Sequence, residues 1–150
     1  MEYFTKELWR QINSKKQEER ERAEKEWEEN AKKYCDYIQR NKYMKIREIH
    51  KKLAQYDFHD SEIDALCWNS GKQEFVISIN GYAGNLQIIY SKVKKINLGL
   101  NDAVAVPIGL RWGYYELLQE SRRLITMDML FDFENELTIT AESIDINEKR

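Results

Sequence analysis

Apolar residues in the first third of the chain recur at helical spacing. Leu8, Trp9 and Ile12 follow Thr5, whose hydroxyl suits the N-cap of a first helix. A second run is mostly charged but keeps one narrow apolar stripe, made of Ala23, Trp27, Ala31, Tyr34 and Ile38. A third run carries Ile46, Ile49 and Leu53 at steps of three and four. The pattern therefore predicts about three helices within residues 1–56, and the chain is expected to turn at Asn41 between the second and the third.

From residue 57 onward the apolar positions alternate. Runs with a step of two cover residues 63–67, 75–79, 86–90, 104–108 and 137–141. The run 124–133 is apolar on both faces and predicts a central strand, whereas 115–118 fits a strand or a helix. Asn80-Gly81 is typical of a two-residue hairpin turn, and Asn135 is expected in another turn. Pro107 confines the 104–108 strand to an edge.

The last apolar residues break the alternation. Ile144 and Ile146 are out of phase with residues 137–141, which predicts a β-bulge near Glu142-Ser143. Five to seven strands with short links predict an antiparallel meander that forms a sandwich or partial barrel. The expected class is α+β, with a helical part at 1–56 and a β domain at 57–150, together one compact unit.

The balance of charge changes at the same place in the chain. It also indicates which classes of partner the chain is expected to bind. Residues 1–56 carry 15 Lys and Arg against 11 Asp and Glu, net +4; the remainder carries 9 against 15, net −6, which sums to the overall −2. Because acids and bases are interleaved along 15–33, no basic stripe for nucleic acid is expected. Apolar runs are too short to predict a membrane span. The separated Cys35 and Cys67 are typical of a reducing, cytoplasmic compartment.

The densest polar cluster lies where the helices give way to strands. It comprises His59, Asp60, Ser61 and Glu62, flanked by Asp57 and Asp64. One hypothesis is a metal-dependent hydrolase that uses His59, Asp60 and neighbouring carboxylates. The alternative is that these side chains bond loose backbone groups at the junction.

Other chemistry finds little support in the residue types. A zinc site would need Cys35, Cys67, His50 and His59 together, without paired-ligand spacing. A glycine-flanked nucleophile and a phosphate-binding glycine loop are both missing from the sequence. We therefore expect no catalytic residue, metal or cofactor, and a protein that is not an enzyme.

Two features suggest binding to proteins. The helix expected within 15–38 could join copies of the chain into a homo-oligomeric structural protein, or dock on its own sheet. Trp112, Tyr114 and Tyr115, with Tyr82 in a loop, could form an exposed recognition patch, or pack within the sheet. The partner would be another protein.

Two passages resemble an uncharacterised domain family of spore-forming Gram-positive bacteria. They are Tyr3-Phe4-Thr5-Lys6-Glu7-Leu8-Trp9 and Phe58-His59-Asp60-Ser61-Glu62-Ile63, supported by Leu130-Phe131, Glu136-Leu137-Thr138-Ile139 and Ile144-Asp145-Ile146 near the end. The middle segment departs from the family, which has a longer, proline-containing stretch there. The resemblance implies an N-terminal helical part and a β-rich half, but no activity.

The β half is also similar to immunity proteins of bacterial polymorphic toxin systems, which bind and block a toxin. That similarity implies a bacterial, cytoplasmic, non-enzymatic binding domain with a toxin domain as its partner. The metal-dependent hydrolase and the homo-oligomer remain the alternatives.

Overall fold

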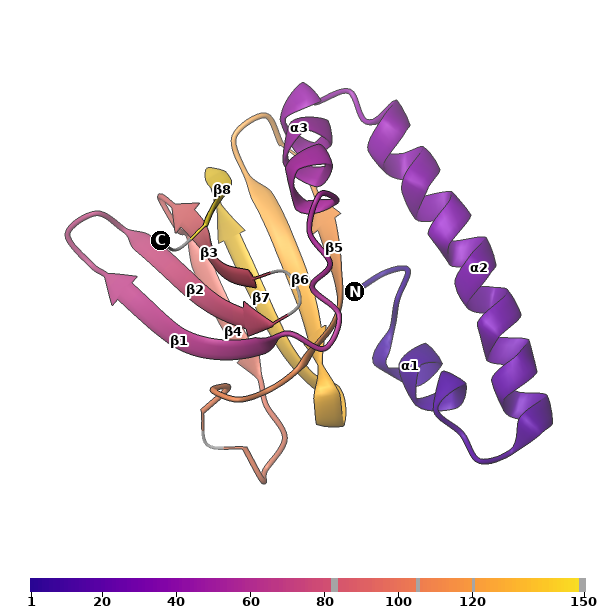
Figure 1. The fold of residues 1–150 in the computed structure, drawn as a ribbon. Helices are drawn as coiled ribbons and strands as arrows, with labels where there is room; N and C mark the ends of the chain where they lie inside the picture. Colours follow the sequence, from indigo (N-terminus) through magenta and orange to yellow (C-terminus); the bar gives the residue numbers. More distant parts are fainter. Residues whose placement is uncertain (82–83, 105, 120, 149–150) are drawn as a thin grey trace.

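The fold begins with three helices, as the sequence predicts (Figure 1). The computed structural model describes residues 1–81, 84–104, 106–119 and 121–148. Helix α1 spans Lys6–Ile12, α2 spans Gln17–Arg40 and α3 spans Met44–Leu53. Thr5 caps α1 as expected, because its hydroxyl accepts a hydrogen bond of 3.2 Å from the Leu8 amide. No helix in the described ranges combines the length and the apolar character that a membrane crossing requires.

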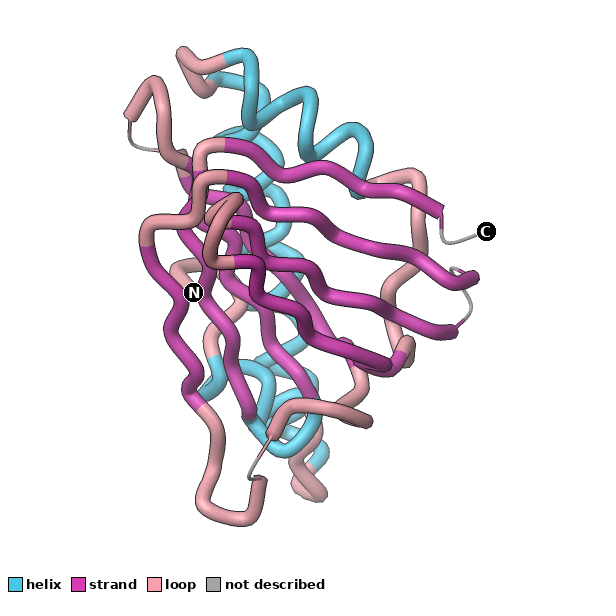
Figure 2. The backbone as a smooth tube through the Cα atoms, turned by 90° about the vertical axis from the view of Figure 1, so that its left-hand side faces the viewer, coloured by secondary structure: helices cyan, strands magenta, loops and turns pink. Residues whose placement is uncertain are grey.

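Eight antiparallel strands follow and form two sheets. Their bounds are β1 Glu62–Asn69, β2 Glu74–Gly81, β3 Gly84–Ser91, β4 Lys95–Gly99, β5 Trp112–Leu118, β6 Ile125–Phe131, β7 Asn135–Ala141 and β8 Ser143–Glu148, with a 3-10 turn at Asp132–Glu134. One sheet has the order β1-β2-β3-β8 and the other β4-β7-β6-β5. Seen from the side, the strands of the two sheets cross steeply (Figure 2). The protein is therefore an α+β, sandwich-like fold whose described strands do not close into a barrel.

The core lies between the crossed sheets and under the helices. Alternate residues of β2, β3 and β7 face inward, and the inner strand β6 is buried on both faces, as its continuous apolar run predicts. Tyr90, Trp112 and Phe131 are among its largest buried side chains. Helix α3 contacts β8 and β5, while α1 and α2 flank the β5 side of the molecule (Figure 1). The boundary expected after residue 56 falls in the link between α3 and β1.

Helix α2 also covers the open edge of β5. The amide of Leu117 donates to the Tyr34 hydroxyl at 2.7 Å, and the amide of Gln119 donates to the Tyr37 hydroxyl at 2.9 Å. Edge strands otherwise present unpaired backbone groups. Two tyrosines one turn apart on a helix thus replace a neighbouring strand.

The strand predicted at 104–108 was wrong. No described residue of 104–108 lies in a strand (Ala105 is outside the described residues); instead β4 lies at Lys95–Gly99. Asn101 bends this segment, because its side chain accepts from the Ala103 amide and its carbonyl accepts from the Val104 amide.

The hairpin at Asn80-Gly81 exists, but its turn lies further along the chain. Asn80 and Gly81 both belong to β2, and Gly81 pairs with Gly84 across the hairpin, so the connecting residues 82–83 are outside the described part. Asn135 does not lie in a turn either. It begins β7, is buried, and its side-chain oxygen accepts from the Asn101 amide at 2.8 Å.

The change of phase before residue 144 has a different cause from the predicted bulge. β7 belongs to one sheet and β8 to the other, so the chain crosses between the sheets at Glu142. Ile144 then pairs with Tyr90 and faces the same core from the opposite side. A strand that switches sheets must reverse its inward positions, and this reversal explains the sequence pattern.

Candidate functional site

The link between α3 and β1 holds the two sheets together at one corner. The Asp60 amide donates to the Trp112 carbonyl at 3.0 Å, and the Trp112 amide donates to the Ser61 carbonyl at 2.7 Å. One step further, the Ile63 amide donates to the Leu110 carbonyl at 3.0 Å, and Glu62 forms an isolated β-bridge with Arg111. The predicted polar cluster therefore lies at the joint between β1 and β5.

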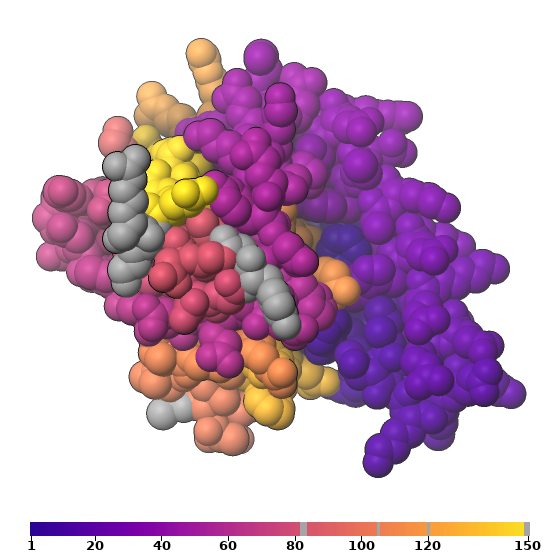
Figure 3. All heavy atoms as spheres, in the orientation of Figure 1, coloured from indigo at the N-terminus to yellow at the C-terminus, as the bar shows by residue number. Residues whose placement is uncertain are grey.

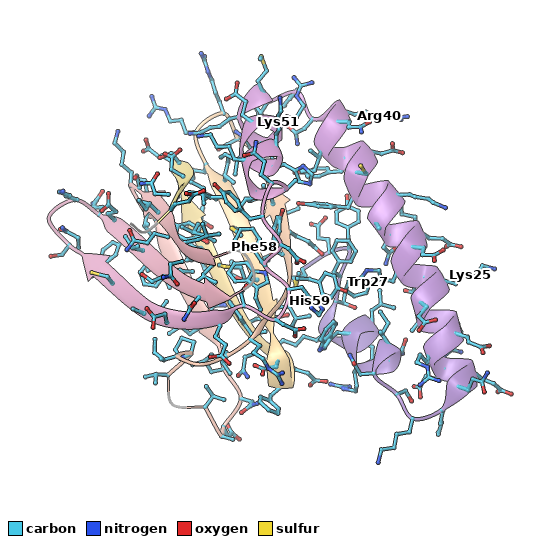
Figure 4. The ribbon with its side chains drawn as sticks, in the orientation of Figure 1. Lys25, Trp27, Arg40, Lys51, Phe58 and His59 are labelled. Atoms are coloured by element: carbon cyan, nitrogen blue, oxygen red, sulfur yellow. The ribbon has the colours of Figure 1, made fainter. Side chains whose placement is uncertain are left out.

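His59 and Asp60 form a pair at the surface of this joint. Their side chains are 50% and 55% exposed, and Nδ1 of His59 lies 3.1 Å from Oδ2 of Asp60. The His59 amide donates to the Asp57 side chain at 3.0 Å. Asp60 has a positive φ of 60°, which aspartate tolerates better than most residues. Figure 4 shows His59 at the side of the strands that faces Trp27, and its ring lies 6.1 Å from that of Tyr114.

The described side chains around His59 do not assemble a metal site. No group of three His, Cys, Asp or Glu side chains in the described ranges is placed to hold a metal ion. The Asp57 side chain accepts from the His59 backbone amide, and Glu62 is exposed. Of the residues that the hydrolase hypothesis requires, the described geometry brings together only His59 and Asp60.

Ser61 has a different environment from its neighbours in the motif. Its side chain is fully buried, and its hydroxyl has no hydrogen-bond partner in the described structure. It packs against Gly81 so closely that a Cβ at position 81 would lie 2.4 Å from the Ser61 oxygen and 2.7 Å from its Cα. Ser61 and Gly81 thus allow β2 to approach the joint.

The three described aromatic residues of the expected recognition patch, Trp112, Tyr114 and Tyr115, do not share an exposed surface. Trp112 is only 2% exposed and stacks on Phe58, so the expectation of exposure is wrong for this residue. The cause is the register of β5, which turns Trp112 toward the sandwich core. Tyr115 is largely buried beside it, and burial raises the pKa of Tyr115 to about 12. Tyr82 is outside the described residues.

Tyr114 belongs to an aromatic layer that fixes the helices to β5. The layer consists of Phe4, Trp9, Trp27 and Tyr114, whose ring centroids are 4.2–6.3 Å apart. Trp27 points from α2 toward the strands, while Lys25 on the same helix points away (Figure 4). Ala23, Tyr34 and Ile38 of the same stripe are buried as well. The apolar stripe expected within 15–38 therefore packs inside the chain and leaves a charged face outward.

Large apolar side chains are also exposed on edge strands, in the 100–110 loop and in the 3-10 turn. Seven are exposed in the described part of the chain, and we call six of them the apolar rim: Trp68, Ile96, Leu98, Val106, Ile108 and Phe133. The 100–110 loop lies against the start of β1 and against the 3-10 turn, because the Gly109 amide donates to the Ile63 carbonyl and the Asn101 side chain donates to the Phe133 carbonyl. This loop hangs below the sheets in Figure 1.

Three rim residues stand at positions that a sheet normally buries. Leu98 pairs with Leu137 and Ile96 with Ile139, and both partners are fully buried, so β4 turns its apolar side chains inward. Yet Ile96 is 37% and Leu98 49% exposed. Trp68 pairs with the buried Phe75 and is 48% exposed. The edge strands β1 and β4 thus carry inward-facing apolar groups that the opposite sheet does not cover.

The sequence contains a signal for this strand that the predicted elements did not include. Ile96, Leu98 and Leu100 step by two, which is a strand pattern. The flanking lysines and asparagines made the segment resemble a polar link. Whether these side chains are exposed depends on how much of β4 the opposite sheet covers. A local sequence pattern does not determine this.

The fold and joint define an α+β sandwich with helices fixed over one edge strand. Comparisons with known protein families and with curated proteins find no match. Among solved structures, the chain is similar to one described as the crystal structure of an uncharacterized protein from Neisseria gonorrhoeae. The identity is 14% and the TM-score 0.48, over 62% of this chain and 95% of that one.

Proposed function

We propose that the protein is a non-enzymatic protein-binding domain and that the apolar rim contacts the partner. The observation that carries this proposal is the exposure of Ile96, Leu98 and Trp68 at inward-facing positions of two edge strands. Exposed apolar side chains favour protein interaction, because covering them removes apolar area from water. An immunity-like inhibitor of a bacterial toxin is the specific form of this function that the sequence resemblance favours.

Affinity capture from a lysate of the host cells tests the proposal. We expect the immobilised protein to retain one partner in stoichiometric amount. Replacing Leu98 by Ser and Phe133 by Asn removes two rim side chains and should reduce capture at least about tenfold, since central apolar contacts dominate binding. Met44 is 65% exposed but lies on α3, outside the rim, so Met44→Ser is the matched control and should capture normally. Failure to retain a stoichiometric partner, or equal capture by the rim variant, would contradict the proposal.

The immunity-like form requires a further result. If the captured partner is a toxin domain, co-expression of the wild-type protein should protect cells from it, and the rim variant should not. A partner whose expression is harmless would leave protein binding intact and remove the immunity-like form.

A further inference from the structure

Positive side chains from three segments gather beside the first turn of α3. The cluster comprises Lys45 of α3, Lys92 and Lys94 of the β3–β4 link, Arg122 and Arg123 of the β5–β6 link, and Glu142 at the crossover from β7 to β8. The atoms of the β5–β6 link stand at the surface next to those of α3 (Figure 3). Lys45, Arg122, Arg123 and Glu142 line an open hollow of about 540 Å³, within the size range of small-ligand sites.

Glu142 is the one carboxylate among the described residues that line this hollow, and three lysines converge on it. The ammonium groups of Lys92 and Lys94 lie 3.5 Å and 3.6 Å from its two carboxylate oxygens. Lys45 donates to its backbone carbonyl. Among the described residues of the cluster, one carboxylate therefore faces five cations, a local excess of four positive charges in a protein whose net charge is −2.

The two arginines have no ion-pair partner among the described residues. Neither Arg122 nor Arg123 forms an ion pair with a described residue, and both side chains are exposed. A guanidinium presents paired donors in a planar fork that matches two oxygens of one phosphate group. Adjacent arginines on a short link can present two such forks to the same anion.

The local backbone adds to the positive potential. α3 has no acidic residue in its first turn, and its N-cap, Tyr43, makes no side-chain cap. Acidic residues are the favourable choice near a helix N-terminus, yet Lys45 occupies this turn. Lys92 has a positive φ of 53°, a backbone conformation that is less favourable for lysine than for glycine. Its ammonium group forms an ion pair with Glu142 from this position.

We propose that this hollow binds the phosphate chain of a small polyphosphate ligand. A single carboxylate would leave most of the excess charge unbalanced, whereas a diphosphate carries about the charge required. The ligand would displace the loose contacts of Lys92 and Lys94 with Glu142 and add bonds to both arginines. The residues that line this hollow are not among the six rim residues, so each proposal can fail without the other.

Titration calorimetry with inorganic pyrophosphate tests the site. We expect binding that weakens as ionic strength rises. Arg122→Gln with Arg123→Gln should weaken it at least about tenfold, because each arginine supplies charge-assisted hydrogen bonds. Arg20 and Arg22 are exposed on α2, far from the hollow, so Arg20→Gln with Arg22→Gln is the charge-matched control and should bind within about twofold of wild type.

Glu142→Gln provides a test that loss of folding cannot imitate. It removes the competing carboxylate and should strengthen pyrophosphate binding at least about threefold. Absence of pyrophosphate binding, equal weakening by the α2 control, or weaker binding after Glu142→Gln would each overturn the proposal. So would tighter binding, dependent on the same arginines, of a deca-glutamate peptide or of a single-stranded oligonucleotide, which would assign the surface to an acidic protein or to nucleic acid.

Discussion

Glu116 on β5 shows how a single buried residue organises the start of the chain. Its side chain is fully buried, and its carboxylate accepts from three successive backbone amides, those of Glu2, Tyr3 and Phe4, at 2.7, 2.8 and 2.5 Å. Burial of a carboxylate is costly unless such donors compensate it. The same bonds place Phe4 in the aromatic layer, so this one residue links the first segment to β5.

Substitution of Glu116 by Gln should destabilise the fold. The amide keeps one acceptor oxygen but turns an NH₂ group toward backbone donors, so we expect a loss of about 2–3 kcal/mol in the free energy of unfolding. Urea denaturation measures this change. Glu24 is exposed on α2, and Glu24→Gln should shift the value by no more than about 0.5 kcal/mol. Equal effects of the two substitutions would contradict the role of Glu116.

Gly81 is required by its distance to Ser61. An alanine methyl group would lie 2.7 Å from the Ser61 Cα, so the backbone of the joint must move. We expect Gly81→Ala to cost about 1–3 kcal/mol in the free energy of unfolding. At Gly71 the nearest atom to an added Cβ is 3.6 Å away, and Gly71→Ala should be close to neutral. Thermal unfolding of both variants compares them directly, and a neutral Gly81→Ala would show that the joint is looser than described.

At the scale of elements, α2 stabilises β5 through hydroxyl groups as well as through packing. The Tyr34 side chain is almost fully buried, and burial raises the pKa of its hydroxyl far above the ordinary value. Its oxygen accepts from an amide that has no strand on that side. A tyrosine in a helix is usually assigned to packing, so the sequence alone gave no reason to expect this bond.

The substitution Tyr34→Phe isolates the contribution of that bond. It keeps the ring but leaves the Leu117 amide unpaired, which should cost about 1–3 kcal/mol and accelerate hydrogen exchange at Leu117. Tyr37→Phe should cost less, because the Gln119 amide is only partly buried. Exchange rates measured by NMR test both changes, and an unaltered rate at Leu117 in Tyr34→Phe would argue against the edge-covering role.

At the scale of the whole molecule, the contact between α3 and α2 makes stability depend on pH. The His50 ring lies 5.9 Å from the Tyr34 ring, and burial lowers the pKa of His50 below its usual value of 6.5. The unfolded chain therefore binds a proton at higher pH than the folded one. The free energy of unfolding should fall as the pH drops below about 6.5 and through the folded pKa.

Replacing His50 by Gln should flatten this part of the pH profile. Denaturation at pH 7.5 and at pH 5.5 measures the slope in each protein, and the variant should lose less stability between the two. The same slope in both proteins would assign the pH dependence to other groups.

The sequence determined the elements and their class, because these depend on local spacing. The helical spacing of apolar residues predicted α1, α2 and α3, and their alternation predicted most strands. Thr5 and Asn41 marked helix boundaries correctly. Residues that accept bonds within a few positions, such as Asp57 at the joint, were also foreseeable.

Only the tertiary structure decided which of these residues lie together and which stay exposed. Trp112 and Leu98 both lie on β-strands, yet one is buried under the crossing sheet and the other extends beyond it. The gathering of Lys45, Arg122 and Lys92 likewise depends on the crossover at Glu142, which the sequence showed only as a change of phase. Periodicity reports the face of an element, whereas exposure and charge clustering depend on contacts between segments far apart in the chain.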